Sequence, residues 1–150
     1  MAKNEWSMAQ LIAKAEAYCA AAEHCSSEVN NKLLQWEATS EQTEHIIAHL
    51  LKEKYIDEER YCRAFAHDKL LYQGWGRVKI RAALYAKQLP STHITQALDS
   101  LNEDEYSDTL KRVMASKKRA IKSNDPMARE KLIRFCLQRG FTYEEISKHL

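Results

Sequence analysis

Glycine and proline are scarce in this chain of 150 residues, which has three Gly and two Pro. β-Hairpins and β-sandwiches need many turns that depend on these two residues, so their scarcity argues against an all-β fold. Residues that favour helix, such as Ala, Leu, Lys, Glu and Gln, dominate instead. The composition therefore predicts an all-α protein, as one domain or a short array of repeats.

Paired cysteines and long apolar runs are also missing. Cys19, Cys25, Cys62 and Cys136 form no CxxC pair, and a core of this size needs no disulfide framework, so we expect reduced, mostly buried thiols. No apolar run approaches the roughly 18 residues of a membrane span. The stretch MAKNEWSMAQ at the N-terminus lacks the apolar segment of a signal peptide. These features predict a cytoplasmic protein.

Motifs for catalysis or metal binding are weak. His45 and His49 have the i, i+4 spacing of zinc ligands on a helix, but the Glu of an HExxH motif is missing and the pair faces away from the apolar stripe. The acidic run that starts at Asp57 is better explained as a helix cap and first-turn charges than as acid–base chemistry. No Gly-rich phosphate loop is present. We therefore expect no enzyme activity, no metal and no cofactor.

Charge is spread unevenly along the chain. Residues 1–56 carry five Lys and Arg against eight Asp and Glu, residues 57–102 seven against five, and residues 103–150 eleven against eight. These balances predict a basic face on the C-terminal two-thirds of the protein. An ordinary solvated surface of mixed charge is the alternative, and the sequence leaves it open.

Helix-start and helix-stop signals predict nine helices. Capping boxes are expected at Ser7–Gln10, Thr39–Gln42 and Thr142–Glu145. Other starts are expected at Ser26, Asp57, Ser91, Asn102 with Glu105, and Asp125 with Pro126 in the first helical position, and Gly74 and Gly140 are expected to end helices. In the fourth predicted helix, Tyr61, Ala64, Phe65 and Tyr72 share the apolar face.

An internal repeat groups these helices in threes. Residues 79–98 align with residues 131–150 at an offset of 52, so that Ile80 meets Leu132 and Leu84 meets Cys136. A period near this length predicts tandem three-helix repeats, here residues 1–56, 57–102 and 103–150. Because neighbouring repeats need only local contacts, we expect an elongated, curved array.

The stretch QGWGRVKIR, residues 73–81, holds two of the three glycines. Gly74 can take the left-handed conformation that ends a helix, and Gly76 allows a sharp turn into the next one. Trp75 then lies at a corner, either wedged into the core or exposed to a nucleic-acid base or a partner groove. Arg77, Lys79 and Arg81 lie off the apolar stripe near a helix N-terminus, where the helix dipole disfavours cations. They indicate either an anionic partner outside them or ordinary solvated positions, and the sequence leaves both open.

Residues 54–90 resemble the RecX family of regulatory proteins. The resemblance is carried by a tyrosine–aliphatic–aspartate start, an Arg–aromatic helix, a Trp–Gly turn and a basic Ile-x-x-x-Leu helix. The residues with these features are Tyr55, Ile56, Asp57, Arg60, Tyr61, Phe65, Gly74, Trp75, Gly76, Ile80 and Leu84. Lys54 stands where many relatives have glycine.

The resemblance implies a monomeric modulator of the RecA recombinase that acts in DNA repair, recombination and the SOS response. Such proteins bind in the helical groove of the RecA–ssDNA filament and limit its recombinase, ATPase and co-protease activities, with or without direct contact to ssDNA or dsDNA. The predicted binding face consists of Arg63, Lys69, Arg77, Lys79, Arg81, Lys87, Arg112, Lys118, Arg119 and Arg139. A stand-alone nucleic-acid-binding protein with helix-turn-helix-like units is the second interpretation, and a helical adaptor between proteins is the third.

Overall fold

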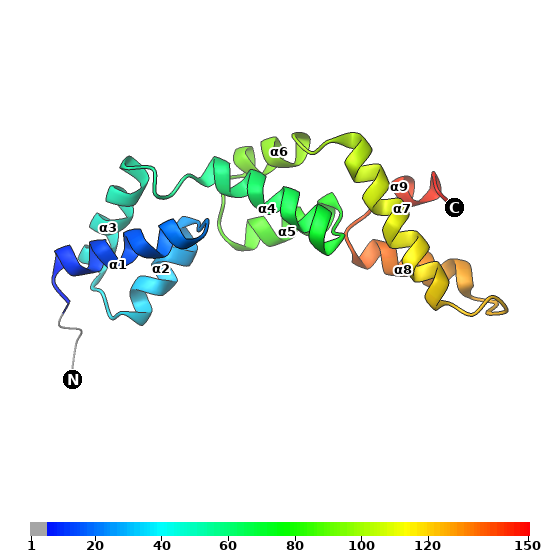
Figure 1. Ribbon diagram of the computed structural model, residues 1–150, viewed down its shortest axis with the longest axis horizontal. Coiled ribbons are helices and arrows are strands. Elements are labelled where there is room, and N and C mark those ends of the chain that lie inside the picture. The colour runs from blue at the N-terminus through cyan, green and yellow to red at the C-terminus, as the bar shows by residue number, and fades with distance from the viewer. Residues whose placement is uncertain (1–5) are drawn as a thin grey trace. The chain divides into compact units, whose positions relative to one another are not determined.

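The computed structural model describes residues 6–150 (Figure 1). The first five residues, which belong to the predicted first repeat and to the stretch without a signal-peptide pattern, lie outside the described residues. Within residues 6–150 the chain forms nine α-helices and no strand, which confirms the predicted all-α fold. The helices are α1 (Met8–Ala21), α2 (Ser26–Gln35), α3 (Ser40–Lys52), α4 (Glu58–Gln73), α5 (Arg77–Ala86), α6 (Ser91–Asp99), α7 (Glu103–Ala120), α8 (Ala128–Gln138) and α9 (Tyr143–Ser147).

The three predicted capping boxes form. In each, a hydroxyl accepts a hydrogen bond from the amide three residues later, and that later side chain accepts one from the amide of the cap residue. They are Ser7–Gln10, Thr39–Gln42 and Thr142–Glu145. Asn102 caps α7, because its side chain accepts a hydrogen bond from the Glu105 amide. At the start of α4 the Asp57 carboxylate accepts a hydrogen bond of 3.0 Å from the Arg60 amide.

Two helix starts differ from the prediction. Pro126 is not the first helical residue, because α8 begins at Ala128 and the Asp125 carboxylate accepts the Met127 amide in a turn before the helix. Cys25, not Ser26, is the N-cap of α2, and there Glu28 accepts the Cys25 amide. α6 begins at Ser91, as predicted, and Pro90 occupies its N-cap position. At Asp125 the turn that the carboxylate forms with the Met127 amide competes with the predicted helix start.

The predicted apolar face of α4 is wrong at its C-terminal end. Tyr72 is 77% exposed, and the fully buried side chains are those of Cys62, Ala66 and Leu70. Apolar residues occur on every side of this helix, so the sequence pattern fits more than one face.

The described chain divides into two compact units. The first comprises residues up to Tyr61 together with Lys87–Leu89. In it α1, α2 and α3 pack against one another, as the blue to cyan ribbons of Figure 1 show. Its core consists of Leu11, Ala15, Cys19, Val29, Leu33, Ile46, Leu50 and Ile56.

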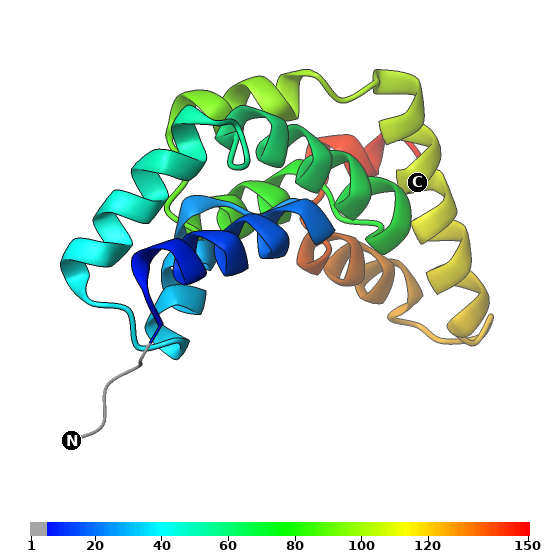
Figure 2. The ribbon, with the colours of Figure 1, turned by 60° about the vertical axis from the view of Figure 1, so that its left-hand side comes forward.

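The second unit comprises Cys62–Ala86 and Pro90–Leu150. In it α5 packs on α6, α7 on α8, and α8 on α9, the last three drawn from yellow to red in Figure 2. Its buried side chains include Leu70, Ile80, Leu84, Leu110 and Phe141. All four cysteines are buried and none forms a disulfide, as predicted. No helix within residues 6–150 combines the length and apolarity that crossing a membrane requires.

Candidate interaction surface

The three glycines of the chain all lie at one junction in the second unit. The Gly76 amide donates to the Arg139 carbonyl at 2.8 Å, and the Val78 amide donates to the Gly140 carbonyl at 3.0 Å. A Cβ atom on residue 76 would lie 2.4 Å from the Gly140 oxygen, so only glycine allows this approach. The turn before α5 is thereby fixed against the end of α8.

Trp75 is held at this corner by Gly74, which has a φ of 66° at the end of α4. The indole is half-buried, and its ring packs edge-to-face on Phe65 with 6.4 Å between centroids. The ammonium groups of Lys69 and Lys79 lie 4.9 Å and 4.5 Å from the centre of the ring. Trp75 is therefore neither fully buried in the core nor fully exposed: it packs on Phe65 of α4 and lies beside two cations.

A shallow hollow of about 450 Å³ adjoins the end of α4, and its wall includes Gly74, the residue that precedes Trp75 in the chain. Three arginines from the predicted binding face line it, Arg112 and Arg119 on α7 and Arg139 after α8. Tyr72 forms another part of the wall, and no Asp or Glu does. The Arg139 guanidinium is oriented by a hydrogen bond of 2.8 Å to the Gln73 carbonyl.

This combination suits an anionic, partly aromatic partner. Guanidinium groups bind carboxylates and phosphates through paired hydrogen bonds, and exposed aromatic rings stack on nucleic-acid bases. We name these residues the basic–aromatic surface: Lys69, Tyr72, Trp75, Lys79, Arg112, Arg119 and Arg139.

Arg77, which the sequence placed on the binding face, has partners within the second unit. Its guanidinium donates to Glu103 at 2.8 Å, lies 3.8 Å from the Glu145 carboxylate and covers the Tyr106 ring at 4.0 Å. The Tyr106 hydroxyl accepts the Arg77 amide at 3.0 Å and donates to Glu145 at 3.2 Å. Burial raises the pKa of Tyr106 to about 12, so this hydroxyl stays a donor. The charge of Arg77 is thus used to hold α5, α7 and α9 together.

Lys87 also has a partner, within the first unit. Its ammonium lies 2.9 Å from the Glu28 carboxylate, which the Tyr61 hydroxyl also approaches at 3.4 Å. Burial alone would raise the pKa of Glu28, but hydrogen bonds from Lys87, His24 and the Cys25 amide outweigh burial and lower it. Lys87 therefore neutralises a partly buried carboxylate.

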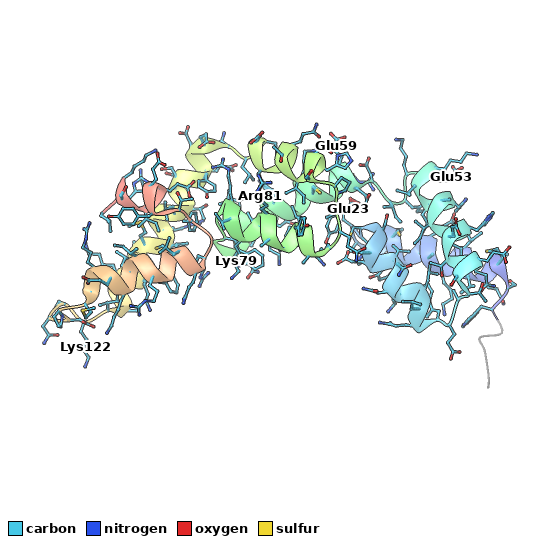
Figure 3. The ribbon with its side chains drawn as sticks, turned by 180° about the vertical axis from the view of Figure 1, so that it is seen from behind. Glu23, Glu53, Glu59, Lys79, Arg81 and Lys122 are labelled. Carbon is cyan, nitrogen blue, oxygen red and sulfur yellow. The ribbon has the colours of Figure 1, made fainter. Side chains whose placement is uncertain are left out.

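The remaining predicted cations lie apart from this surface. Figure 3 shows Lys79 and Arg81 leaving α5 on different sides, and Arg81 reaches the Thr95 hydroxyl at 3.5 Å. Arg63 is exposed on α4, and Lys118 lines a separate groove along α7. Of the ten predicted cations, Arg112, Arg119 and Arg139 line the hollow, and Lys69 and Lys79 lie against the Trp75 ring. Tyr72 was missed because its position in the apolar pattern of α4 indicated burial.

The family-signature residues have structural roles. Arg60 donates to Glu23 at 2.6 Å and lies 3.9 Å from Asp57, within the first unit. Tyr55 packs against the core of that unit, while Ile80 and Leu84 are fully buried in the second.

Within residues 6–150 no group of three or more His, Cys, Asp or Glu could hold a metal ion. His49, one member of the predicted i, i+4 pair, lies 2.8 Å from the Glu16 carboxylate, and His45 is exposed.

Comparison with known proteins places these features in a family. The family model described as the second three-helix domain of RecX matches residues 57–98, and that of the third three-helix domain matches residues 103–150. Regulatory protein RecX of Haemophilus ducreyi is 30% identical, with 82% of this chain and 78% of the relative covered. Regulatory protein RecX of Clostridium tetani is 26% identical, and the match spans 82% of this chain but only 57% of the relative.

Two crystal structures share the fold. RecX from Lactobacillus salivarius superimposes with a TM-score of 0.82 at 16% identity, covering 94% of this chain and 92% of that one. A second crystal structure, of a regulatory protein RecX, has a TM-score of 0.80 at 21% identity, and the match covers 95% of this chain and 74% of that one. Both share the helical architecture described above. The two family models and the Haemophilus relative show that the chain belongs to the RecX family of regulatory proteins.

Proposed function

We propose that this protein regulates the RecA recombinase by binding the RecA–ssDNA filament, and that it mostly inhibits strand exchange, ATP hydrolysis and co-protease activity. It acts by binding and without chemistry of its own, as a cytoplasmic monomer of three three-helix repeats, residues 1–56, 57–102 and 103–150. The observation that supports this most directly is the basic–aromatic surface in a chain of the RecX family.

The partner chemistry of that surface fits a nucleoprotein filament. Arg112, Arg119 and Arg139 are placed for phosphates or for acidic side chains of the protein coat. Tyr72 and Trp75 add aromatic rings for an unstacked base or an apolar edge. Because phosphate contacts release counterions, binding through such a surface weakens as salt is raised.

Contacts from outside the surface are also proposed. Arg63, Arg81 and Lys118 are exposed and extend the set of cations that can face the filament. Arg77 and Lys87 are left out of the proposed contact set, because their charges are used inside the fold.

The test is a titration of ssDNA-dependent ATP hydrolysis by RecA. The protein is expected to lower the rate at amounts well below the nucleotide concentration. The double variant Arg112→Glu with Arg119→Glu is expected to lose this effect, because both side chains are exposed and line the hollow. The matched control is Lys52→Glu with Arg134→Glu, two exposed cations away from the hollow. Equal inhibition by both double variants would reject the basic–aromatic surface as the contact.

A stand-alone nucleic-acid-binding protein is the second candidate, favoured by the aromatic rings beside the arginines. Mobility shifts of ssDNA or dsDNA without RecA, together with no effect on the ATPase, would establish that candidate and reject regulation of RecA.

A further inference from the structure

A second groove, of about 640 Å³, lies in the second unit between α7, α8 and the segment after α9. Its floor is apolar and includes Met114, Ala115, Ile121 and Leu132. No residue lines both this groove and the basic–aromatic surface. The two are therefore separate features.

The rim of this groove is strongly cationic. Lys111, Lys118 and Lys122 on and after α7 face Arg129 on α8, and no Asp or Glu lines the groove. Within residues 6–150 the side chains of these four residues form no hydrogen bond and no ion pair. Three of them, Lys111, Lys122 and Arg129, were not in the predicted binding face. Their charges are not compensated by the fold, so they are available to an outside anion.

The groove runs along the C-terminal part of α7. That helix contributes residues 111, 114, 115 and 118, which share one face over two turns, and residues 121 and 122 continue the lining after the helix ends. At the α-helical rise the helical part corresponds to about 10 Å. Lys122, labelled in Figure 3, lies just past the end of α7 and lines the groove. An apolar floor between two helices can bind the apolar face of a third helix.

The lining argues against a nucleic acid as the occupant. A phosphate chain gains nothing from an apolar floor, and no Phe, Tyr or Trp is present for base stacking. An acidic amphipathic helix matches both parts, because its apolar stripe covers the floor while Asp and Glu beside the stripe reach the rim.

We propose that this groove binds an amphipathic helix of a partner protein, with Asp or Glu flanking the apolar stripe. The inference goes beyond the proposed function, because it concerns a peptide segment and a surface other than the basic–aromatic one. Its occupant is defined by charge complementarity to four uncompensated cations.

The test uses a labelled synthetic helix of about 18 residues, five turns long, with leucines in one stripe and glutamates on both sides. A second peptide of the same composition has the order permuted so that no stripe forms. Fluorescence anisotropy measures binding of each to the full chain. We expect the striped peptide to bind at least tenfold more tightly than the permuted one.

Paired charge reversals test the location. Lys118→Glu with Lys122→Glu should weaken binding of the striped peptide tenfold or more. Lys52→Glu with Arg134→Glu makes the same change in net charge on exposed positions outside the groove and should leave binding within twofold. Circular dichroism melts confirm that both variants fold.

Four results would overturn the inference. Equal binding of both peptides would show attraction by charge alone, and equal loss in both double variants would place the contact elsewhere. Displacement of the peptide by oligothymidylate would make the groove a nucleic-acid site. Sedimentation of the unlabelled chain tests whether a second copy of the chain is the occupant. A dimer that the Lys118→Glu with Lys122→Glu variant no longer forms would establish the second copy in place of a partner helix. None of these assays contains RecA, so their failure leaves the proposed function standing.

Discussion

The backbones of Gly76 and Gly140 touch, although 63 residues of sequence lie between them. The amide of Gly76 donates to the carbonyl next to Gly140, and the carbonyl of Gly140 accepts from Val78. A side chain on either glycine would meet backbone or Cβ atoms within 2.4 Å. This pair of turns joins the helices on both sides of the basic–aromatic surface.

Gly76→Ala is therefore expected to destabilise the protein by about 3 kcal/mol or more, the upper end of what overpacking costs. The added methyl meets the backbone of Gly140, which cannot move without displacing the end of α8. Gly74→Ala is the comparison and should cost less. Its methyl meets only the tip of the Val113 side chain, and the left-handed φ of residue 74 costs a side chain about 1–2 kcal/mol. Thermal and urea unfolding measure both. Equal stability of the wild type and Gly76→Ala would contradict the close backbone approach.

Arg77→Lys is expected to lower the free energy of unfolding by about 1–2 kcal/mol, because an ammonium cannot replace the guanidinium fork. The Glu103 pair contributes little, since that side chain is 79% exposed, so the loss comes mainly from the Tyr106 ring and from Glu145. Arg81→Lys, on the same helix but exposed, should stay within about 0.5 kcal/mol of the wild type. Urea unfolding measures the stability of both variants. If Arg77→Lys is as stable as the wild type, the structural role of Arg77 is rejected and this arginine is again a candidate for the binding face.

Lys54→Gly is expected to stabilise the protein by about 0.5–1 kcal/mol. Lys54 has a φ of 61°, which costs a side chain about 1–2 kcal/mol, and the greater freedom of glycine in the unfolded chain offsets part of this gain. Lys54→Ala removes the same charge but keeps a Cβ, so it should give no gain. If both variants melt at the same temperature, backbone strain at residue 54 is not the cause.

Glu28 makes stability depend on acid pH. Its pKa is lower in the folded chain than its usual 4.5, so ionisation of this group stabilises the fold above that value. The contribution is lost as the pH falls through the folded pKa. Stability measured by urea unfolding below about pH 4.5 should therefore fall less steeply in Glu28→Gln than in the wild type. Glu44→Gln, at an exposed position, is the control and should follow the wild-type curve. If the stability of all three proteins falls equally steeply below about pH 4.5, Glu28 is not a source of this pH dependence.

The helices could be predicted from sequence because their starts are local events. Ser7–Gln10 and Thr142–Glu145 are pairs three residues apart, so the information needed to place the cap lies within one turn. Where a local alternative existed the prediction was wrong, as at Asp125, whose carboxylate forms a turn ahead of the helix.

The site was only partly predictable because its geometry is long-range. Arg77 has the same sequence pattern as Arg81, yet it pairs with Glu103 and Glu145, which are 26 and 68 residues away in the chain. No periodicity in the sequence shows that these carboxylates approach. The convergence of Arg112 and Arg139 on one hollow likewise depends on how α7 packs on α8.

The position of Trp75 between Lys69 and Lys79 has a practical consequence. The chain has three tryptophans, and replacing Trp6 and Trp36 by phenylalanine would leave a single indole emitter, within the basic–aromatic surface. An anion bound by these two ammonium groups would alter the electric field at the ring, so we expect a shift of the emission wavelength. Such a variant would serve as an intrinsic optical reporter of binding, with which unlabelled ligands could be ranked by spectroscopy.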